Sequence, residues 1–448
     1  MRITNQAAQQ AAINNIFRIS EDLFNTQNAL SSGKKLQRSS DDPSVTRQTL
    51  SVKTSIGQSN QFLRNINNNM GFVSYSETAL ESASLNLVRA KELVVSEIGS
   101  KSTSTTRLFA AEEISGIISE VIFSANSKFE NRFLFAGDKV DSSPFSVSAS
   151  GAVYQGNTGN ISLAISKNTN LQINLPGSDT FSADLNPTVT TNTLLSDLNG
   201  GQGITEGSFI LTDRQGNSST IDVSASGSLG DVLSTINNTA LNVTASINDS
   251  NNGIKLTDTS SLIKQSLTIT EVSDSTTAKS LGFIGERNGI MEGFDLNPKL
   301  NSSDTLSQLN DGQGISLTEI GIVNGSASGT VSFSSLNSSS TIGNILDLIN
   351  KSDLDVTAGI ASDGKSLRII SNTSTTVSVV SEVGSGNSAE LLGLGGGRNI
   401  ITTLVQTQQA LEKNDSTALV ALIDNLDKVV NSISGSRANL GTITRRLN

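Results

Sequence analysis

Apolar residues recur every seven positions near the amino-terminal end of the chain. The repeat spans residues 45–94 and is interrupted only by Ser59. A seven-residue repeat places apolar side chains along one side of a helix, and a partner helix covers that stripe in a coiled coil. We therefore expect a helical interface at Val45, Val52, Ile66, Val73, Leu80, Leu87 and Val94.

A second seven-residue ladder lies at the carboxyl-terminal end of the sequence. Because the two ladders stand at opposite ends of the chain, their pairing would make everything between them an insertion into a helical rod. We expect Val73 and Leu426 to be buried in one bundle. The predicted interface positions of this second ladder are Leu419, Leu422, Leu426, Val429, Ile433, Leu440, Ile443 and Leu447.

Helix signals divide the first 130 residues into three predicted helices. The first covers residues 4–30, carries the apolar positions Ile16, Leu23 and Leu30, and ends before Gly33, a suitable C-cap residue. Asp42 and Pro43 are typical of the start of the second helix, residues 43–98, which would be roughly 80 Å long. The third helix is expected over residues 105–129.

The middle of the chain contains an internal repeat. The segment that begins at Leu195 matches the segment that begins at Leu306, 111 positions later, and each is followed by a hydroxyl-capped helix, at Ser228 and at Thr341. Alternating strands flank both helices. Each unit is therefore expected to be a small α+β module, and its Gly-Gln-Gly sequence a tight turn, because no Lys-Ser/Thr follows as in a phosphate-binding loop.

These patterns predict a multidomain fold of the α plus α+β class. It would be a long antiparallel helical coiled-coil rod made by both chain ends, with duplicated β-rich modules inserted between them. The expected divisions are residues 1–42, an amino-terminal helix and connector forming an inner layer; 43–140 with 398–448, the rod; 141–185, a β-rich connecting segment; 186–285, the first module; and 286–397, the second.

Composition excludes several classes of function. The 448 residues include no Cys, His or Trp, so there is no disulfide, no thiolate nucleophile and no histidine base or zinc ligand. A net charge of -10 argues against nucleic acid as the main partner. No apolar run is long enough to span a membrane, and the amino terminus lacks the apolar core of a cleavable signal peptide. We expect neither a cofactor nor a metal, and no enzyme; a carboxylate hydrolase is the most distant alternative.

Short motifs in the amino-terminal third resemble the flagellin superfamily. They are Met1-Arg2-Ile3-Thr4, the stretch from Leu30 to Leu36, and Ser40-Asp41-Asp42-Pro43. The run Asn131-Arg132-Phe133-Leu134-Phe135-Ala136-Gly137 and the later Tyr154-Gln155-Gly156 favour the hook-associated proteins of type 3 over filament flagellins. The family motif thus includes Asp41, Asp42, Pro43, Arg132, Phe133, Phe135 and Gly137.

The resemblance implies a structural subunit at the junction of hook and filament in the bacterial flagellum. It implies assembly with itself, with the hook, with an adjacent junction protein and with flagellin, and export without a cleavable signal, aided by a secretion chaperone. The alternatives are a filament flagellin and, from another class, a secreted surface adhesin that uses the β-rich repeats.

The resemblance also implies a further carboxyl-terminal helix that would pair with the first helix. Family members continue beyond the match to Ser436-Arg437-Ala438-Asn439-Leu440-Gly441, whereas this sequence stops at Asn448. We therefore expect either a fragment or a truncated protein, in which the apolar face of residues 13–30 is exposed in the monomer.

Overall fold

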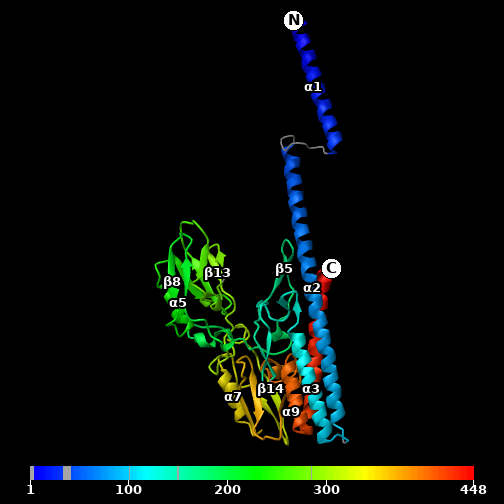
Figure 1. Ribbon diagram of the computed structural model, residues 1–448, viewed down its shortest axis with the longest axis vertical. Helices are drawn as coiled ribbons and strands as arrows, with labels where there is room; N and C mark the ends of the chain where they lie inside the picture. Colours follow the sequence, from blue (N-terminus) through cyan, green and yellow to red (C-terminus); the bar gives the residue numbers. More distant parts are fainter. Residues whose placement is uncertain (1–4, 34–41, 100, 149–150, 284, 448) are drawn as a thin grey trace. The chain divides into compact units, whose positions relative to one another are not determined.

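The computed structural model describes residues 5–33, 42–99, 101–148, 151–283 and 285–447. These residues fall into two units, which are described separately: residues 1–67 with 164–170, and residues 68–163 with 171–448. Long helices form both ends of the chain and a β-rich region lies between them in the sequence (Figure 1). Within the described residues, no helix is both long and apolar enough to cross a membrane.

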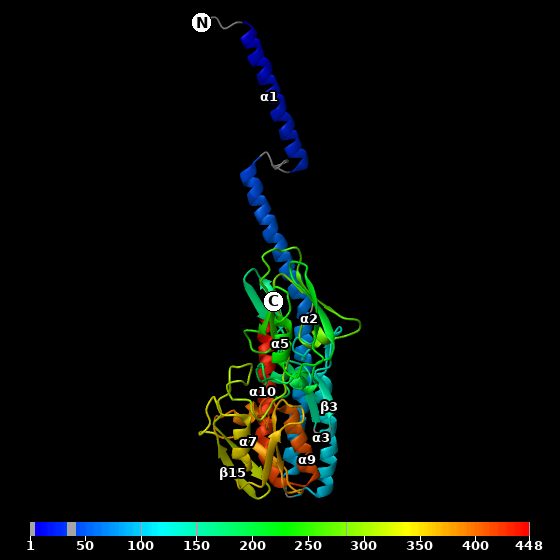
Figure 2. The same cartoon turned by 90° about the vertical axis from the view of Figure 1, so that its left-hand side faces the viewer.

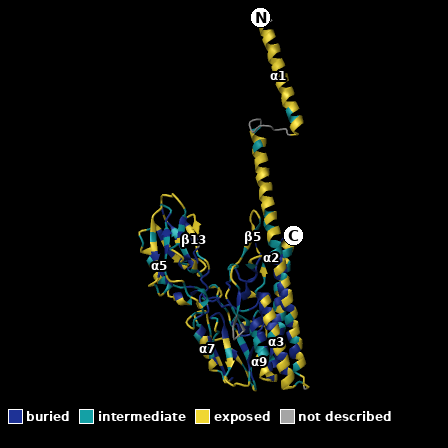
Figure 3. Cartoon of the chain, in the orientation of Figure 1, coloured by how far each residue is buried: buried dark blue, intermediate teal, exposed yellow. Residues whose placement is uncertain are grey.

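The first unit consists largely of helix α1 (Asn5–Ser32) and the start of helix α2 (Pro43–Glu97). Asp42 caps α2, because its Oδ1 accepts hydrogen bonds from the backbone N–H groups of Ser44, at 2.9 Å, and Val45, at 3.1 Å. The expected start of this helix is therefore confirmed. The large apolar residues of α1 are exposed along its length (Figure 3).

In the second unit, the part of α2 from Asn68 onward lies beside three further helices (Figures 1 and 2). The side chain of Arg107, near the start of one of these helices, connects the end of α2 to the segment between the other two. Its Nε and Nη2 donate to the carbonyl of Glu97, and its Nη1 lies 2.6 Å from Oδ1 of Asn414. The three helices are α3 (Ser104–Ala125), α9 (Ile400–Glu412) and α10 (Ser416–Leu447).

Helix α3 ends four residues earlier than the sequence pattern predicted. Asn126 follows it, and its amide pairs with Phe145 in both directions, donating to the Phe145 carbonyl and accepting from the Phe145 N–H, both at 2.9 Å. These bonds lead the chain from the helix into short antiparallel hairpins. The strands are β1 (Lys128–Phe129), β2 (Arg132–Phe133), β3 (Phe145–Ser148), β4 (Gly151–Tyr154), β5 (Ser162–Ser166) and β6 (Thr169–Gln172), and the short 3-10 helix η1 (Gly177–Asp179) follows.

The first β-rich module, residues 195–293, has its own hydrophobic core under a helix with a capped start. Two antiparallel sheets, in the order β12-β11-β7-β8 and β13-β10-β9, build it. Its elements are η2 (Leu195–Asp197), α4 (Leu198–Gly201), β7 (Ser208–Thr212), β8 (Ser218–Asp222), α5 (Leu229–Asn237), β9 (Val243–Ile247), β10 (Ile254–Asp258), β11 (Leu267–Glu271), α6 (Thr277–Ser280), β12 (Glu286–Arg287) and β13 (Ile290–Glu292).

These elements correct the predicted boundary of the first module and confirm its predicted glycine turn. Strands β12 and β13 pair with β11 and β10, so residues 286–292 belong to the first module and the expected boundary after residue 285 is wrong. The Gly-Gln-Gly segment makes a turn as predicted, since Gly201 and Gly203 both have positive φ angles, 83° and 77°.

The second β-rich module, residues 306–394, has a separate hydrophobic core. Helix α10 packs against its strands β14 and β18, and the amide of Asn425 donates to the carbonyl of Val380 at 2.7 Å. The elements are β14 (Glu319–Asn324), β15 (Ala327–Ser332), α7 (Ile342–Asn350), β16 (Val356–Ile360), β17 (Leu367–Ser371), β18 (Ser378–Glu382) and α8 (Ser388–Leu391), with sheets in the order β15-β14-β18 and β16-β17.

Candidate functional site

The predicted ladder positions divide into exposed and buried groups. In α2, Val45 and Val52 are exposed and Ile66 is half-buried, whereas burial is complete from Val73 onward. In α1, Ile16, Leu23 and Leu30 are all exposed. The buried positions are Val73, Leu80, Leu87 and Val94 in α2 and Leu419, Leu422, Leu426, Val429, Ile433, Leu440, Ile443 and Leu447 in α10. Their role in assembly stays a prediction.

Ion pairs join α2 to its neighbours in the second unit. The guanidinium of Arg437 in α10 lies 2.8 Å from Glu77 and 3.3 Å from Glu81 in α2. Further along, Lys91 of α2 pairs with Asp427 of α10. These partly exposed pairs add little stability singly, but they fix which positions of the two helices lie together.

The motif residues Arg132 and Phe133 form strand β2, and Phe135 and Gly137 follow it directly. The Arg132 guanidinium lies over the Phe72 ring, 5.2 Å from its centroid, while Phe133 and Phe135 are buried. This apolar run is thus packed into the protein. Asp41, the remaining acidic residue of the motif, lies outside the described residues.

The two motif segments around Phe135 and Tyr154 interlock. The buried Tyr154 hydroxyl lies 3.1 Å from the carbonyl of Phe135 and 2.8 Å from that of Asn157. Burial raises the pKa of Tyr154, so the hydroxyl stays a hydrogen-bond donor. Gly137 has a φ angle of 72°, and a Cβ there would meet the Asn157 carbonyl at 2.2 Å, so the sequence needs glycine at this position.

A polar junction that the sequence patterns did not predict lies where the chain enters each module. The first linker, residues 184–189, leads into the first module, and the second linker, residues 295–300, leads into the second. Asp184-Leu185-Asn186-Pro187 recurs as Asp295-Leu296-Asn297-Pro298, again 111 positions later. That repeated sequence is the signal that could have identified the junction.

Each linker is bonded to the module that it does not enter. The N–H groups of Asn310 and Asp311, in the second module, donate to the carbonyls of Leu185 and Asn186 in the first linker, at 2.8 and 3.1 Å. The first module makes the corresponding bonds to the second linker. The N–H groups of Asn199 and Gly200 donate to the carbonyls of Leu296 and Asn297, both at 2.7 Å.

The side chains follow the same crossed pattern. Leu185 belongs to the core of the second module, and Leu296 belongs to the core of the first. The two modules therefore contact one another through their linkers, by bonds at corresponding positions.

One half of this junction contains a buried ion pair. The ammonium of Lys365 lies 2.6 Å from Oδ2 of Asp184 and 3.1 Å from Oδ1 of Asn297, and 4.9 Å from the centroid of the Tyr154 ring. Because Tyr154 also binds the Phe135 segment, this lysine joins the linkers, the second module and the motif segments.

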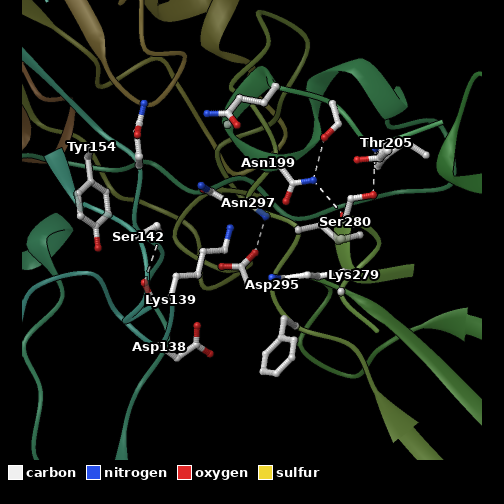
Figure 4. A pocket seen from close by; sticks show the side chains of 18 of the residues that line it. Asp138, Lys139, Ser142, Tyr154, Asn199, Thr205, Lys279, Ser280, Asp295 and Asn297 are labelled. Carbon is white, nitrogen blue, oxygen red and sulfur yellow. Dashed lines mark hydrogen bonds between the residues drawn. The ribbon is translucent and has the colours of Figure 1, made fainter. Parts of the chain in front are cut away.

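A polar cavity of about 780 Å³ lies beside the junction (Figure 4). Lys139, Asn199, Lys279, Asp295 and Asn297 are among the side chains around it. Among the residues that the structure describes, no three His, Cys, Asp or Glu side chains are grouped as metal ligands. The polar side chains of the junction connect the two linkers to the modules.

Comparison with known proteins agrees with the motif residues. Residues 3–140 match the family model of the bacterial flagellin N-terminal helical region. The chain carries a flagellin-type amino-terminal region. This match confirms the resemblance to the flagellin superfamily that the motif residues indicated.

Solved structures of flagellar proteins are also similar. They include a protein assigned as a flagellar hook-associated protein from Vibrio parahaemolyticus, with 25% identity, 31% of this chain and 62% of that chain covered, and a TM-score of 0.29. The chain therefore spans less than two thirds of that relative. The flagellar junction protein FlgL from Legionella pneumophila has 14% identity, with 91% and 94% covered and a TM-score of 0.35. FliC from Burkholderia pseudomallei has 13% identity, with 85% and 100% covered and a TM-score of 0.26. No curated protein matches the chain.

Proposed function

We propose that this chain is a structural, non-catalytic subunit of the bacterial flagellum at the hook–filament junction. The flagellin-type region at residues 3–140 supports this assignment. The observation that carries it furthest is the uncovered apolar face of α1, where Ile16, Leu23 and Leu30 are between 59% and 84% exposed. A helix with such a face is stabilised chiefly by packing, so it suits contact with other subunits.

The proposed rod is an antiparallel coiled coil of α2 and α10. Two features support it. The ladder positions from Val73 to Val94 in α2 and those of α10 are buried, and the ion pairs run in opposite directions, from Glu77 to Arg437 and from Lys91 to Asp427. As the numbering rises in α2 it falls in α10. We propose the exposed ladder positions Val45 and Val52 as contacts with neighbouring subunits.

We propose that the two modules are duplicated copies of one unit. Helices α5 and α7 support this, since each starts with a capping box, at Ser228 with Asp231 and at Thr341 with Asn344. The crossed bonds of the linkers occupy equivalent positions in both. The other proposed divisions are residues 1–42, 43–140 with 398–448, and 141–185, with the boundary between the modules moved beyond Glu292.

The proposed partners are further copies of this chain, the hook, an adjacent junction protein and flagellin. Export to the flagellum would proceed without a cleavable signal peptide and with a secretion chaperone bound to the helical ends. Amphipathic helices that lack their subunit contacts need such cover before assembly.

Deletion of the gene and labelling of the protein in the flagellum would test the proposal. Without a junction protein, hooks should form while flagellin is released unattached into the medium. Labelled protein should occupy one narrow zone between hook and filament. Label along the whole filament would instead assign the chain as a filament flagellin, and normal filaments after deletion would contradict both roles.

A further inference from the structure

The two halves of the linker junction differ in charge although their backbones match. In the first half, the ammonium of Lys365 lies between the Asp184 carboxylate and Oδ1 of Asn297. The equivalent positions in the second half are Asn252, Asp295 and Asn186. Their equivalence follows from matching backbone bonds, since the N–H of Leu185 donates to the carbonyl of Lys365 and the N–H of Leu296 donates to that of Asn252, both at 2.8 Å.

Asn252 does not replace the lysine. Its side-chain oxygen accepts a hydrogen bond from Asn248 at 2.9 Å, and its N–H donates to Oδ1 of the same residue at 3.0 Å. These bonds hold Asn252 within its own module. In addition, its side chain is a neutral amide, so it supplies no charge to match the lysine ammonium of the other half.

An additional carboxylate enters the second half. Asp311 occupies the position equivalent to Gly200, where a Cβ would lie 3.8 Å from Nδ2 of Asn297 and 3.9 Å from Cε of Lys365. A side chain at this position therefore points toward the space that the lysine fills in the first half. Oδ1 of Asp311 accepts from Nδ2 of Asn186 at 2.6 Å.

The second half thus has two carboxylates and an unused acceptor. Oδ2 of Asp295 and Oδ2 of Asp311 lie 3.4 and 3.5 Å from the same Thr158 hydroxyl, which has one proton to donate. Oδ1 of Asn186 has no hydrogen-bond partner although the residue is only 2% exposed. Its counterpart, Oδ1 of Asn297, accepts from the lysine ammonium.

Within the part of the chain that the structure describes, no cation contacts the two carboxylates of the second half directly. Among the described residues, neither Asp295 nor Asp311 forms an ion pair with a lysine or arginine. The charges of Lys139, on the cavity wall, and of Lys365 act on Asp295 without an ion-pair contact.

We propose that Asp295, Asp311, Asn186 and Thr158 bind a calcium ion in the place that corresponds to the Lys365 ammonium. Calcium prefers carboxylate, amide and hydroxyl oxygens and accepts irregular geometry, whereas magnesium requires a near-ideal octahedron. Its charge balances the two carboxylates. The four residues come from both linkers, the second module and the segment after Tyr154, so the ion joins the same parts that Lys365 joins on the other side.

Calorimetric titration of the full chain with calcium chloride at pH 7.5 tests the proposal, after dialysis against a chelator. We expect one calcium ion bound per chain and a melting temperature that rises with calcium concentration. Asp311→Asn should weaken binding by more than about tenfold. Asp347→Asn, which removes an exposed acid on α7 that pairs with Lys351, is the matched control and should bind calcium normally.

The double variant Asn252→Lys with Asp311→Gly separates loss of the site from loss of the fold. It gives the second half the residues of the first, so the chain should stay folded with a melting temperature that no longer depends on calcium. Two results would overturn the proposal: no heat of binding in the unmodified chain at pH 7.5, which would leave a shared proton as the balancing charge, or unchanged calcium binding in Asp311→Asn.

Discussion

The Lys365 ammonium and the Asp184 carboxylate form an ion pair of 2.6 Å in which both side chains are at most 3% exposed. The two residues lie 181 positions apart, one in the second module and one in the first linker. Such a pair specifies which segments meet, because either charge left alone in this interior is strongly unfavourable.

Lys365→Met should therefore destabilise the chain by about 3–5 kcal/mol, since it leaves Asp184 buried without a partner. Chemical denaturation followed by circular dichroism measures the loss. Lys351→Met, at an exposed pair on α7, should change stability by no more than about 0.5 kcal/mol. A small effect of Lys365→Met would mean that water reaches Asp184.

Leu426→Asp should destabilise the helices of the second unit by several kcal/mol, because a carboxylate would enter a position that is fully buried. Thermal melting of the helical signal gives the comparison. Val420→Asp in the same helix is the control, as that side chain is 54% exposed and tolerates a charge. Equal melting of the two variants would argue against the proposed coiled coil.

Stability in calcium-free buffer should fall as pH rises from about 4 to about 6. The pKa of Asp311 is raised from 3.8 to about 6 in the folded chain, so the folded state binds more protons than the unfolded state in this window. Burial is the main cause of this raised pKa, and the charges of Asp295, Asp184 and Asp179 add to it. Asp311→Asn should flatten this part of the profile of melting temperature against pH, and an unchanged profile would contradict the assignment.

Amide exchange should separate α1 from the buried part of α2. In a verified monomer we expect fast exchange from Asn5 to Ser32, whose apolar residues are exposed, and slow exchange from Phe72 to Val94. Mass spectrometry of peptides from the exchanged chain measures both. Strong protection of α1 would show that it packs within its own chain.

The seven-residue ladders predicted the long helices well, because periodicity depends only on local geometry. They could not tell that burial in α2 begins near Phe72, so Val45 and Val52 were placed in the same seam as Val73. Coverage of a stripe depends on where a distant segment ends, which no local pattern contains. The early end of α3 has a similar origin, since Asn126 is held by Phe145 from a later strand.

The linker junction was missed for a different reason. Its residues are short polar segments without periodicity, and their importance arises from bonds that cross between modules. Comparison of the two modules beyond the Leu195 and Leu306 segments would have found the repeated Asp-Leu-Asn-Pro sequence. The second module has Lys365 where the first module has Asn252. This difference in charge can be recognised only when the backbone hydrogen bonds show that the two positions correspond.

The crossed linkers also constrain how such a protein can evolve. Each module completes the linker of the other, with Leu185 in the second core and Leu296 in the first. Loss of one module would leave one linker without the turn whose N–H groups donate to it, and one apolar side chain without its core. Lineages that lengthen or shorten this region should therefore gain or lose the modules two at a time.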